Sequence, residues 1–144
     1  MIHRNHAVMA ALLAWLIAQF IKFSTEWVKH RKLDFTYFVS TGGMPSAHSA
    51  SVCALATSVG RSTGVASPVF GVALLFAVIV MFDAQSVRRA AGEQAKILNQ
   101  IVDELLHQHH LSQQKLAELL GHTRLEVFAG MAVGILTGFL LPLY

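Results

Sequence analysis

Charged residues are scarce in this chain. Aspartate, glutamate, lysine and arginine make up only 13% of its 144 residues, whereas hydrophobic residues make up 54%. The mean hydropathy is +0.53. Because an average soluble domain carries about 25% charged residues, this composition excludes an ordinary soluble domain and favours a membrane protein.

Cysteine is also nearly absent. The single cysteine, Cys53, excludes a disulfide framework within one chain. The first apolar stretch is followed by Lys22 and a polar segment rather than by a small-residue cleavage site, which favours a membrane helix over a cleaved signal peptide. The net charge is only +3 and no basic-aromatic stripe is present, so we expect no nucleic-acid partner.

Four apolar stretches predict an all-α integral membrane bundle with four transmembrane helices. They lie at about residues 7–23, 46–60, 68–82 and 125–143, with a loop at 24–43 and a turn at 61–67. The second stretch is rich in small residues and is therefore expected in the interior. The fourth carries Gly130, Gly134 and Gly138 on one face, which predicts close packing against another helix in the same chain or in a second copy.

The segment between the third and fourth stretches has a different pattern. After charged residues at 83–92, the insertion 93–121 carries apolar residues at helical spacing, and we expect short amphipathic helices on the membrane surface. Ser112 is the expected cap of the second of these helices. The chain 1–144 is then one membrane domain with four spans and this insertion.

Four spans place the chemically unusual segments together. The end of the first helix, the start of the second, the end of the third and the start of the fourth must lie at one membrane face. All lysines and arginines except Arg4 and Arg61 also fall on that face. The positive-inside rule therefore predicts that this face is cytoplasmic, in a multi-pass protein of the plasma (inner) membrane.

One motif sits at the start of the second helix, where Gly42 and Gly43 precede Pro45, Ser46, Ala47 and His48. Glycines allow close backbone approach, and the first amides of a helix can bind an anion. The pattern predicts a phosphate-binding turn. The alternative is an ordinary loop-to-helix junction in which Ser46 only caps the helix.

A second motif precedes the fourth helix. His122 and Glu126 are four residues apart, so they share a helix face and the carboxylate can hold one imidazole nitrogen. This arrangement suits a nucleophilic histidine. The alternative is a helix-start histidine with a stabilising glutamate in the first turn.

Together the two motifs resemble the superfamily of type 2 phosphatidic acid phosphatases and vanadium haloperoxidases. The closer resemblance is to its small divergent branch of acid phosphatase/haloperoxidase-related membrane proteins. Residues 45–48 stand where the superfamily has P-S-G-H, and residues 122–130 where it has H-x3-D-V-x2-G, with Glu126 replacing the aspartate. Residues 86–89 look like its S-R element. Lys22 and Arg31 look like its K-x6-R-P element, with eight intervening residues and no following proline.

The resemblance implies a metal-independent phosphatase that needs no cofactor. His122 would attack phosphorus, Glu126 would orient His122, and His48 would protonate the leaving group. The phosphate would be bound by these groups: Lys22, Arg31, Ser46, Ala47, Arg88 and Arg89. Asp83 and Gly43 would support the site. Which of the two arginines faces the phosphate stays open.

These observations predict hydrolysis of a lipid phosphomonoester, of the phosphatidylglycerophosphate or phosphatidate class, by a phosphohistidine mechanism. The alternatives are a polyprenyl diphosphate phosphatase and a non-catalytic membrane scaffold that binds phosphate or phospholipid. Because the superfamily core has more helices than four, we also expect a homodimer, formed through the glycine face of the fourth helix. Two metal alternatives remain, a cation held by Asp83, Glu93 and Glu126, and a histidine tract at 107–110.

Overall fold

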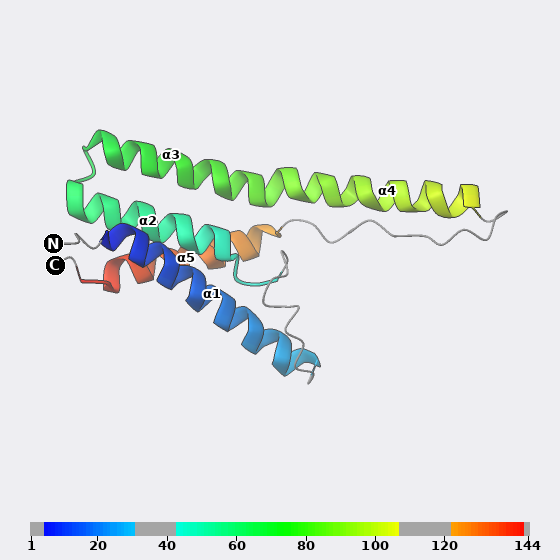
Figure 1. Ribbon diagram of the computed structural model, residues 1–144, viewed down its shortest axis with the longest axis horizontal. Helices are drawn as coiled ribbons and strands as arrows, with labels where there is room; N and C mark the ends of the chain where they lie inside the picture. Colours follow the sequence, from blue (N-terminus) through cyan, green and yellow to red (C-terminus); the bar gives the residue numbers. More distant parts are fainter. Residues whose placement is uncertain (1–4, 31–42, 107–121, 143–144) are drawn as a thin grey trace.

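The computed structural model describes residues 5–30, 43–106 and 122–142, and within these ranges every regular element is helical (Figure 1). The elements are α1 (His6–His30), α2 (Ala47–Thr63), α3 (Pro68–Phe82), a π-helical turn η2 (Asp83–Val87), α4 (Arg88–Leu106) and α5 (Arg124–Leu140). The expectation of an all-helical chain is confirmed for the described residues.

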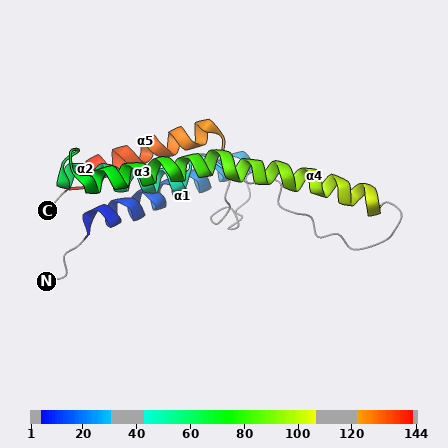
Figure 2. The same cartoon turned by 90° about the horizontal axis from the view of Figure 1, so that it is seen from above.

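Helix α2 is the centre of the bundle and packs against α1, α3 and α5 (Figures 1 and 2). Its contact surfaces consist of small side chains, which bring neighbouring helices close together. A row of alanines in α1 faces a row of alanines in α2, and the buried members are Ala10, Ala14, Ala18, Ala47, Ala50 and Ala54. The expectation that this weakly hydrophobic stretch lies in the interior is therefore confirmed.

The glycine face of α5 packs against α2 of the same chain. A Cβ atom on Gly130 would meet the Ser46 carbonyl oxygen, and one on Gly134 would lie 2.9 Å from Cys53 Cβ. A Cβ atom on Gly138 would lie 2.7 Å from Thr57 Cβ. Of the two partners that the sequence allowed, the structure selects the intrachain one. A homodimer stays a prediction, and it would need a surface other than this buried face.

Large apolar side chains point away from the bundle. In α3, for example, Val72 is 70% exposed and Leu75 61% exposed, while the buried residues are Ala73 and Ala77. Small residues inside and large apolar residues outside are the arrangement expected when lipid rather than water surrounds a bundle. Within the described residues, two helical segments are long and apolar enough to cross a membrane, His6–Thr25 and Pro68–Asp103. Crossing by α2 and α5 stays a prediction.

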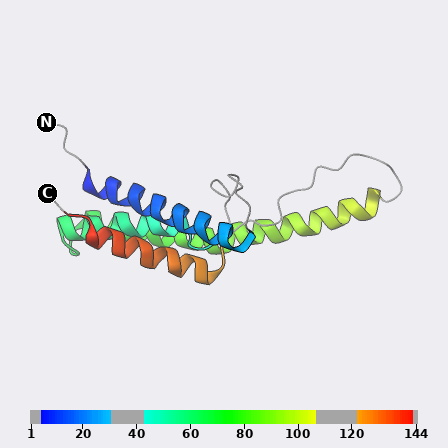
Figure 3. The same cartoon turned by 90° about the horizontal axis from the view of Figure 1, so that it is seen from below.

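The charged residues at 83–92, which the sequence places between the third span and the amphipathic insertion, are helical, and η2 and α4 continue the line of α3 beyond the ends of α2 and α5 (Figures 1 and 3). That segment has charges but no proline, and a change of polarity does not by itself end a helix. The apolar face of α4 is exposed at Ile97, Leu98, Ile101 and Val102. The expected cap Ser112 and the rest of 107–121 lie outside the described residues.

Other boundaries differ by smaller amounts. Helix α1 extends past the expected end of its span as far as His30, so only 31–42 of the predicted loop lies outside the described residues. Helix α2 extends through Thr63, and the expected turn is reduced to Gly64–Ser67. Both Pro68 and Phe82 are predicted and observed limits of α3.

The four segments that were expected to share one face do lie at one end of the bundle. The Ser46 amide donates to the Glu126 carbonyl oxygen at 2.9 Å, which joins the starts of α2 and α5. The His122 amide donates to the Ala84 carbonyl oxygen at 2.9 Å, which joins the segment just before α5 to η2, directly after α3. The end of α1 lies at this end as well (Figure 1).

Candidate functional site

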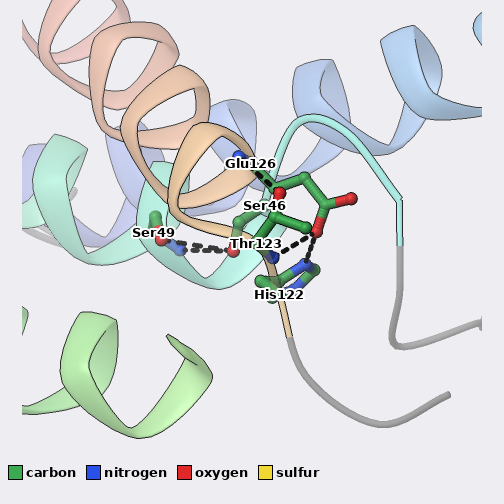
Figure 4. A network of polar contacts seen from close by, with 5 residues as sticks. All are labelled: Ser46, Ser49, His122, Thr123 and Glu126. Atoms are coloured by element: carbon green, nitrogen blue, oxygen red, sulfur yellow. Dashed lines mark hydrogen bonds and ion pairs between the residues drawn. The ribbon is translucent and has the colours of Figure 1, made fainter. Parts of the chain in front are cut away.

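Ser46 connects the starts of two helices. It is the N-cap of α2, and its Oγ accepts hydrogen bonds from the Ser49 amide at 3.4 Å and the Ser49 hydroxyl at 3.2 Å (Figure 4). Both serines are fully buried. The capping role that the sequence left open is thus present. The amides of Ala47 and His48 belong to the first turn of α2, where helix geometry leaves N–H groups without intrahelical acceptors.

His122 lies immediately before α5 and is held by Glu126 in the first turn of that helix. The His122 side chain is 4% exposed, and its Nδ1 lies 3.0 Å from Glu126 Oε2 (Figure 4). Because an ionised carboxylate only accepts hydrogen bonds, the nitrogen that faces it carries the hydrogen. Nε2 is then the imidazole nitrogen that remains for chemistry.

Thr123 completes this arrangement. It is the N-cap of α5, and its Oγ1 accepts from the Glu126 amide at 3.3 Å. In return, the Thr123 amide donates to Glu126 Oε2 at 2.9 Å, so the two residues form a reciprocal capping box. The carboxylate oxygen that holds His122 is therefore also tied to the backbone.

The π-helical turn η2 fixes the backbone of His122. A π-turn shifts the helical hydrogen-bond pattern locally, and such turns are frequent at functional sites. Here the carbonyl oxygen of Ala84 accepts the His122 amide hydrogen at 2.9 Å. Ala84 itself is 2% exposed. The histidine is thus held at its backbone by η2 and at its ring by α5.

His48 approaches His122 from α2. The centroids of the two imidazole rings are 6.3 Å apart, and the rings are tilted by 58°. His48 lies in the first turn of α2 and is partly buried. The structure therefore brings together the two histidines that the sequence placed in separate motifs.

Lys22 lies at the same end of the bundle with a side chain that is 4% exposed. It passes Gly43, where an added Cβ would lie 3.1 Å from Lys22 Cε. Gly43 has φ +98°, in the region that favours glycine. Lys22 and Gly43, which the sequence placed at the same end of the bundle, are thus neighbours.

The other predicted site residues are Asp83, Arg88, Arg89 and Arg31. Asp83 begins η2 and is partly exposed. The backbones of Arg88 and Arg89 begin α4 directly after η2, at the end of the bundle where His122 lies. Arg31 lies outside the described residues.

The two metal alternatives concern different parts of the chain. No group of three or more histidine, cysteine, aspartate or glutamate side chains in 5–30, 43–106 and 122–142 is arranged to hold a metal ion. Asp83, Glu93 and Glu126 are therefore not gathered into such a group. The histidine tract at 107–110 lies outside these ranges.

Two residues of the site were missed by the sequence reasoning. Thr123 had a readable pattern, because T-x-x-E at the start of a helix is a capping-box sequence. Ala84 had none, since its contribution is a backbone carbonyl that becomes relevant only through the packing of α5 against η2.

The chain is similar to known proteins along nearly its whole length. A family model described as "Divergent PAP2 family" matches residues 3–137. The chain is similar to the "Uncharacterized membrane protein YuiD" of Bacillus subtilis (strain 168), with 42% identity over 151 aligned residues that cover 97% of this chain and 96% of that protein. No solved structure matches the chain significantly.

Proposed function

The chain belongs to the divergent PAP2 family, and from this premise we propose that it is a membrane phosphatase that hydrolyses a lipid phosphomonoester through a phosphohistidine. The preferred substrates are of the phosphatidylglycerophosphate or phosphatidate class. The observation that carries the proposal is the imidazole of His122 held by Glu126 at 3.0 Å, with the His48 ring 6.3 Å from the His122 ring.

In the first step, Nε2 of His122 attacks the phosphorus of the substrate. An N–P bond forms, and the bond between phosphorus and the lipid oxygen breaks. His48 gives a proton to the departing alkoxide, so the lipid leaves as an alcohol. Reacting atoms approach to about 3 Å, as do proton donor and acceptor. The two rings, with centroids 6.3 Å apart, are near enough for both histidines to act on one phosphoryl group.

In the second step, water replaces the histidine. His48, now neutral, accepts a proton from water while the water oxygen attacks phosphorus, and the N–P bond breaks to release inorganic phosphate. Glu126 keeps the hydrogen of His122 on Nδ1 throughout and stabilises the positive charge that develops on the ring. His122 then returns to its starting state.

Positive groups would bind the phosphate oxygens and stabilise their charge in the transition state. Lys22 is the described candidate, because its buried side chain reaches the site end of the bundle. The first-turn amides of α2 at Ala47 and His48 are further donors. Arg31, Arg88 and Arg89 are assigned to this role from the sequence motifs alone, and the hydroxyl of Ser46 would support the turn.

A lipid substrate suits the position of the site. Lys22 lies in the last turn of the candidate span His6–Thr25, which places the phosphate seat near the level where hydrocarbon gives way to headgroups. The exterior of the bundle is apolar along α1 and α3. A lipid could therefore present its phosphate to the site while its acyl chains stay beside the helices.

We place the site at the cytoplasmic face of four spans, with both termini outside. The exposed residues Met44, at the site end, and Val65, at the far end, allow a test by single-cysteine labelling in a Cys53→Ala background. A membrane-impermeant thiol reagent should modify Val65→Cys but not Met44→Cys in intact cells. Modification of Met44→Cys alone would reverse the assignment.

The function is tested by phosphate release from a panel of phosphatidylglycerophosphate, phosphatidate and a polyprenyl diphosphate in mixed micelles with a metal chelator. The full-length protein should release phosphate from a monoester, whereas His122→Ala and His48→Ala should each lose at least about 100-fold in kcat. His6→Ala, the same substitution at the far end of α1, is the matched control and should retain activity.

The other outcomes point to the rival functions. Preferential hydrolysis of the polyprenyl diphosphate would replace the monoester as substrate class. Equal release by wild type and both histidine variants, or no release by folded protein from any lipid, would favour a scaffold that binds phospholipid without catalysis. Release restored only by added Mg²⁺ would replace the metal-free mechanism.

A further inference from the structure

One oxygen atom of Glu126 serves two purposes. Oε2 accepts a hydrogen bond from the Thr123 amide at 2.9 Å and lies 3.0 Å from His122 Nδ1. The capping box that starts α5 and the contact that orients the imidazole therefore share a single acceptor. Thr123 Oγ1 closes the box from the other side by accepting the Glu126 amide hydrogen at 3.3 Å.

A glutamate side chain on its own is a poor fixed support. It has three rotatable bonds, and immobilising it has an entropic cost that a partly exposed contact must overcome. Glu126 is 18% exposed, so solvent competes for its oxygens. The reciprocal box removes much of this freedom before His122 is considered, because both the backbone and the carboxylate of Glu126 are bound by Thr123.

The length of the side chain matters for this double use. Glu126 stands at the third position of α5, and a capping box requires a glutamate or glutamine there to reach back to the N-cap amide. The resemblance in the sequence places aspartate at the equivalent position of related proteins. An aspartate is one methylene shorter, so the same atom would reach the N-cap amide less readily.

We propose that Thr123 is a positioning residue for His122. By closing the capping box, Thr123 holds the Glu126 carboxylate where His122 Nδ1–H can donate to it, so that Nε2 is unprotonated and aimed at the phosphorus. This inference rests on the proposed role of His122 as nucleophile. Thr123 acts through Glu126 and needs no contact with the substrate.

The test uses the full-length protein with Thr123→Ala, Thr123→Ser and Ser67→Ala. Alanine at 123 removes the acceptor for the Glu126 amide and loosens the N-cap backbone, so the carboxylate loses its fixed position. Small misplacements of reacting groups cost on the order of 100-fold in rate, and we expect kcat to fall about 10- to 100-fold with KM little changed. Serine keeps the hydroxyl and should restore kcat.

Ser67→Ala is the matched control. Ser67 is the N-cap of α3 at the far end of the bundle, and its Oγ accepts from the Val69 amide at 3.2 Å. Its loss removes a helix cap of the same kind, with a similar expected fall in melting temperature, but leaves His122 untouched. An equal fall in kcat for Ser67→Ala and Thr123→Ala would overturn the proposal.

A second readout is independent of turnover. In ¹⁵N-histidine-labelled protein in detergent micelles, the resonances of His122, identified by their absence in His122→Ala, should report the Nδ1–H tautomer. Thr123→Ala should shift them towards a mixture of tautomers, and Thr123→Ser should not. Unchanged His122 resonances in Thr123→Ala would overturn the proposal. If the wild type hydrolyses no lipid, the proposed function fails, while this experiment still decides whether Thr123 fixes the ring.

Discussion

The two ends of the bundle use polar groups differently. At the far end, Arg61 donates from one guanidinium nitrogen to the carbonyl oxygens of Gly138 and Leu141, both at 2.8 Å, and lies over Phe139. At the site end, His122 and Glu126 contact each other and the start of a helix. Polar groups at the far end terminate helices. Those at the site end also fix the orientation of an imidazole ring, as a catalytic histidine would require.

The glycine row of α5 connects the two ends and gives the largest expected difference between them. A methyl group on Gly130 would meet the Ser46 carbonyl oxygen, which accepts the first hydrogen bond of α2 from the Ala50 amide. Gly130→Ala should therefore separate the starts of α2 and α5, where His48 and His122 lie. We expect a loss of about 1–3 kcal/mol in stability and about 100-fold in kcat.

Gly138→Ala is the matched change at the far end. Its methyl group would meet Thr57 Cβ at 2.7 Å, so a comparable loss of stability is expected. Phosphate release per folded molecule should stay within about twofold of wild type, because the starts of α2 and α5 are not displaced. The expectation that both variants lose stability but only Gly130→Ala loses kcat is checked by measuring the melting temperature and kcat of both variants in detergent. Equal losses of kcat would show that the site does not depend on its local helix junction.

Two glycines of the described chain have positive φ, one at each end of the bundle. Gly43 (φ +98°) lies beside Lys22, whereas Gly64 (φ +85°) has no heavy atom within 4 Å of the position where a Cβ would stand. Alanine at either position incurs a strain of about 1–2 kcal/mol. Only Gly43→Ala places a methyl group 3.1 Å from Lys22 Cε.

We therefore expect Gly43→Ala to raise KM by up to about tenfold, because Lys22 is proposed to bind the phosphate in the ground state as well as in the transition state. Gly64→Ala should leave KM unchanged at a similar melting temperature. Initial-rate kinetics on a phosphatidate series would separate the two. A KM increase in Gly64→Ala, or none in Gly43→Ala, would count against the assignment of Lys22.

Much of the candidate site could be predicted from the sequence. The small residues of α2, the limits Pro68 and Phe82, and the alternation of four apolar stretches together predicted that His48 and His122 would meet. That argument needs only topology, and the 6.3 Å ring separation agrees with it. The T-x-x-E pattern of Thr123 and Glu126 is also a capping-box sequence, so the start of α5 could have been predicted from it.

Other features depend on packing that the sequence does not display. The charges at 83–92 mark a change of polarity but do not reveal that the helix continues through them, and the π-turn that supplies the Ala84 carbonyl has no distinguishing residues. The glycine row of α5 suits close packing against α2 or against a second copy of the chain equally well. The choice depends on which helix surface fits it, and the sequence does not show that. Arg61 was assigned to a turn, but it lies in the last turn of α2 and reaches across to α5.

Arg61 gives the smallest expected effect and the sharpest test of independence between the ends. Arg61→Ala removes two charge-assisted hydrogen bonds, but the side chain is exposed, so we expect a loss of only about 1 kcal/mol. Arg61→Lys should recover only part of it, because the ammonium keeps the charge and the N–H donors but its side chain is one bond shorter than the reach to Nη1. Neither variant should change kcat or KM, measured beside the melting temperature. A severalfold fall in kcat in Arg61→Ala would mean that α5 transmits changes along its length, and the far end would then belong to the functional machinery rather than only to the scaffold.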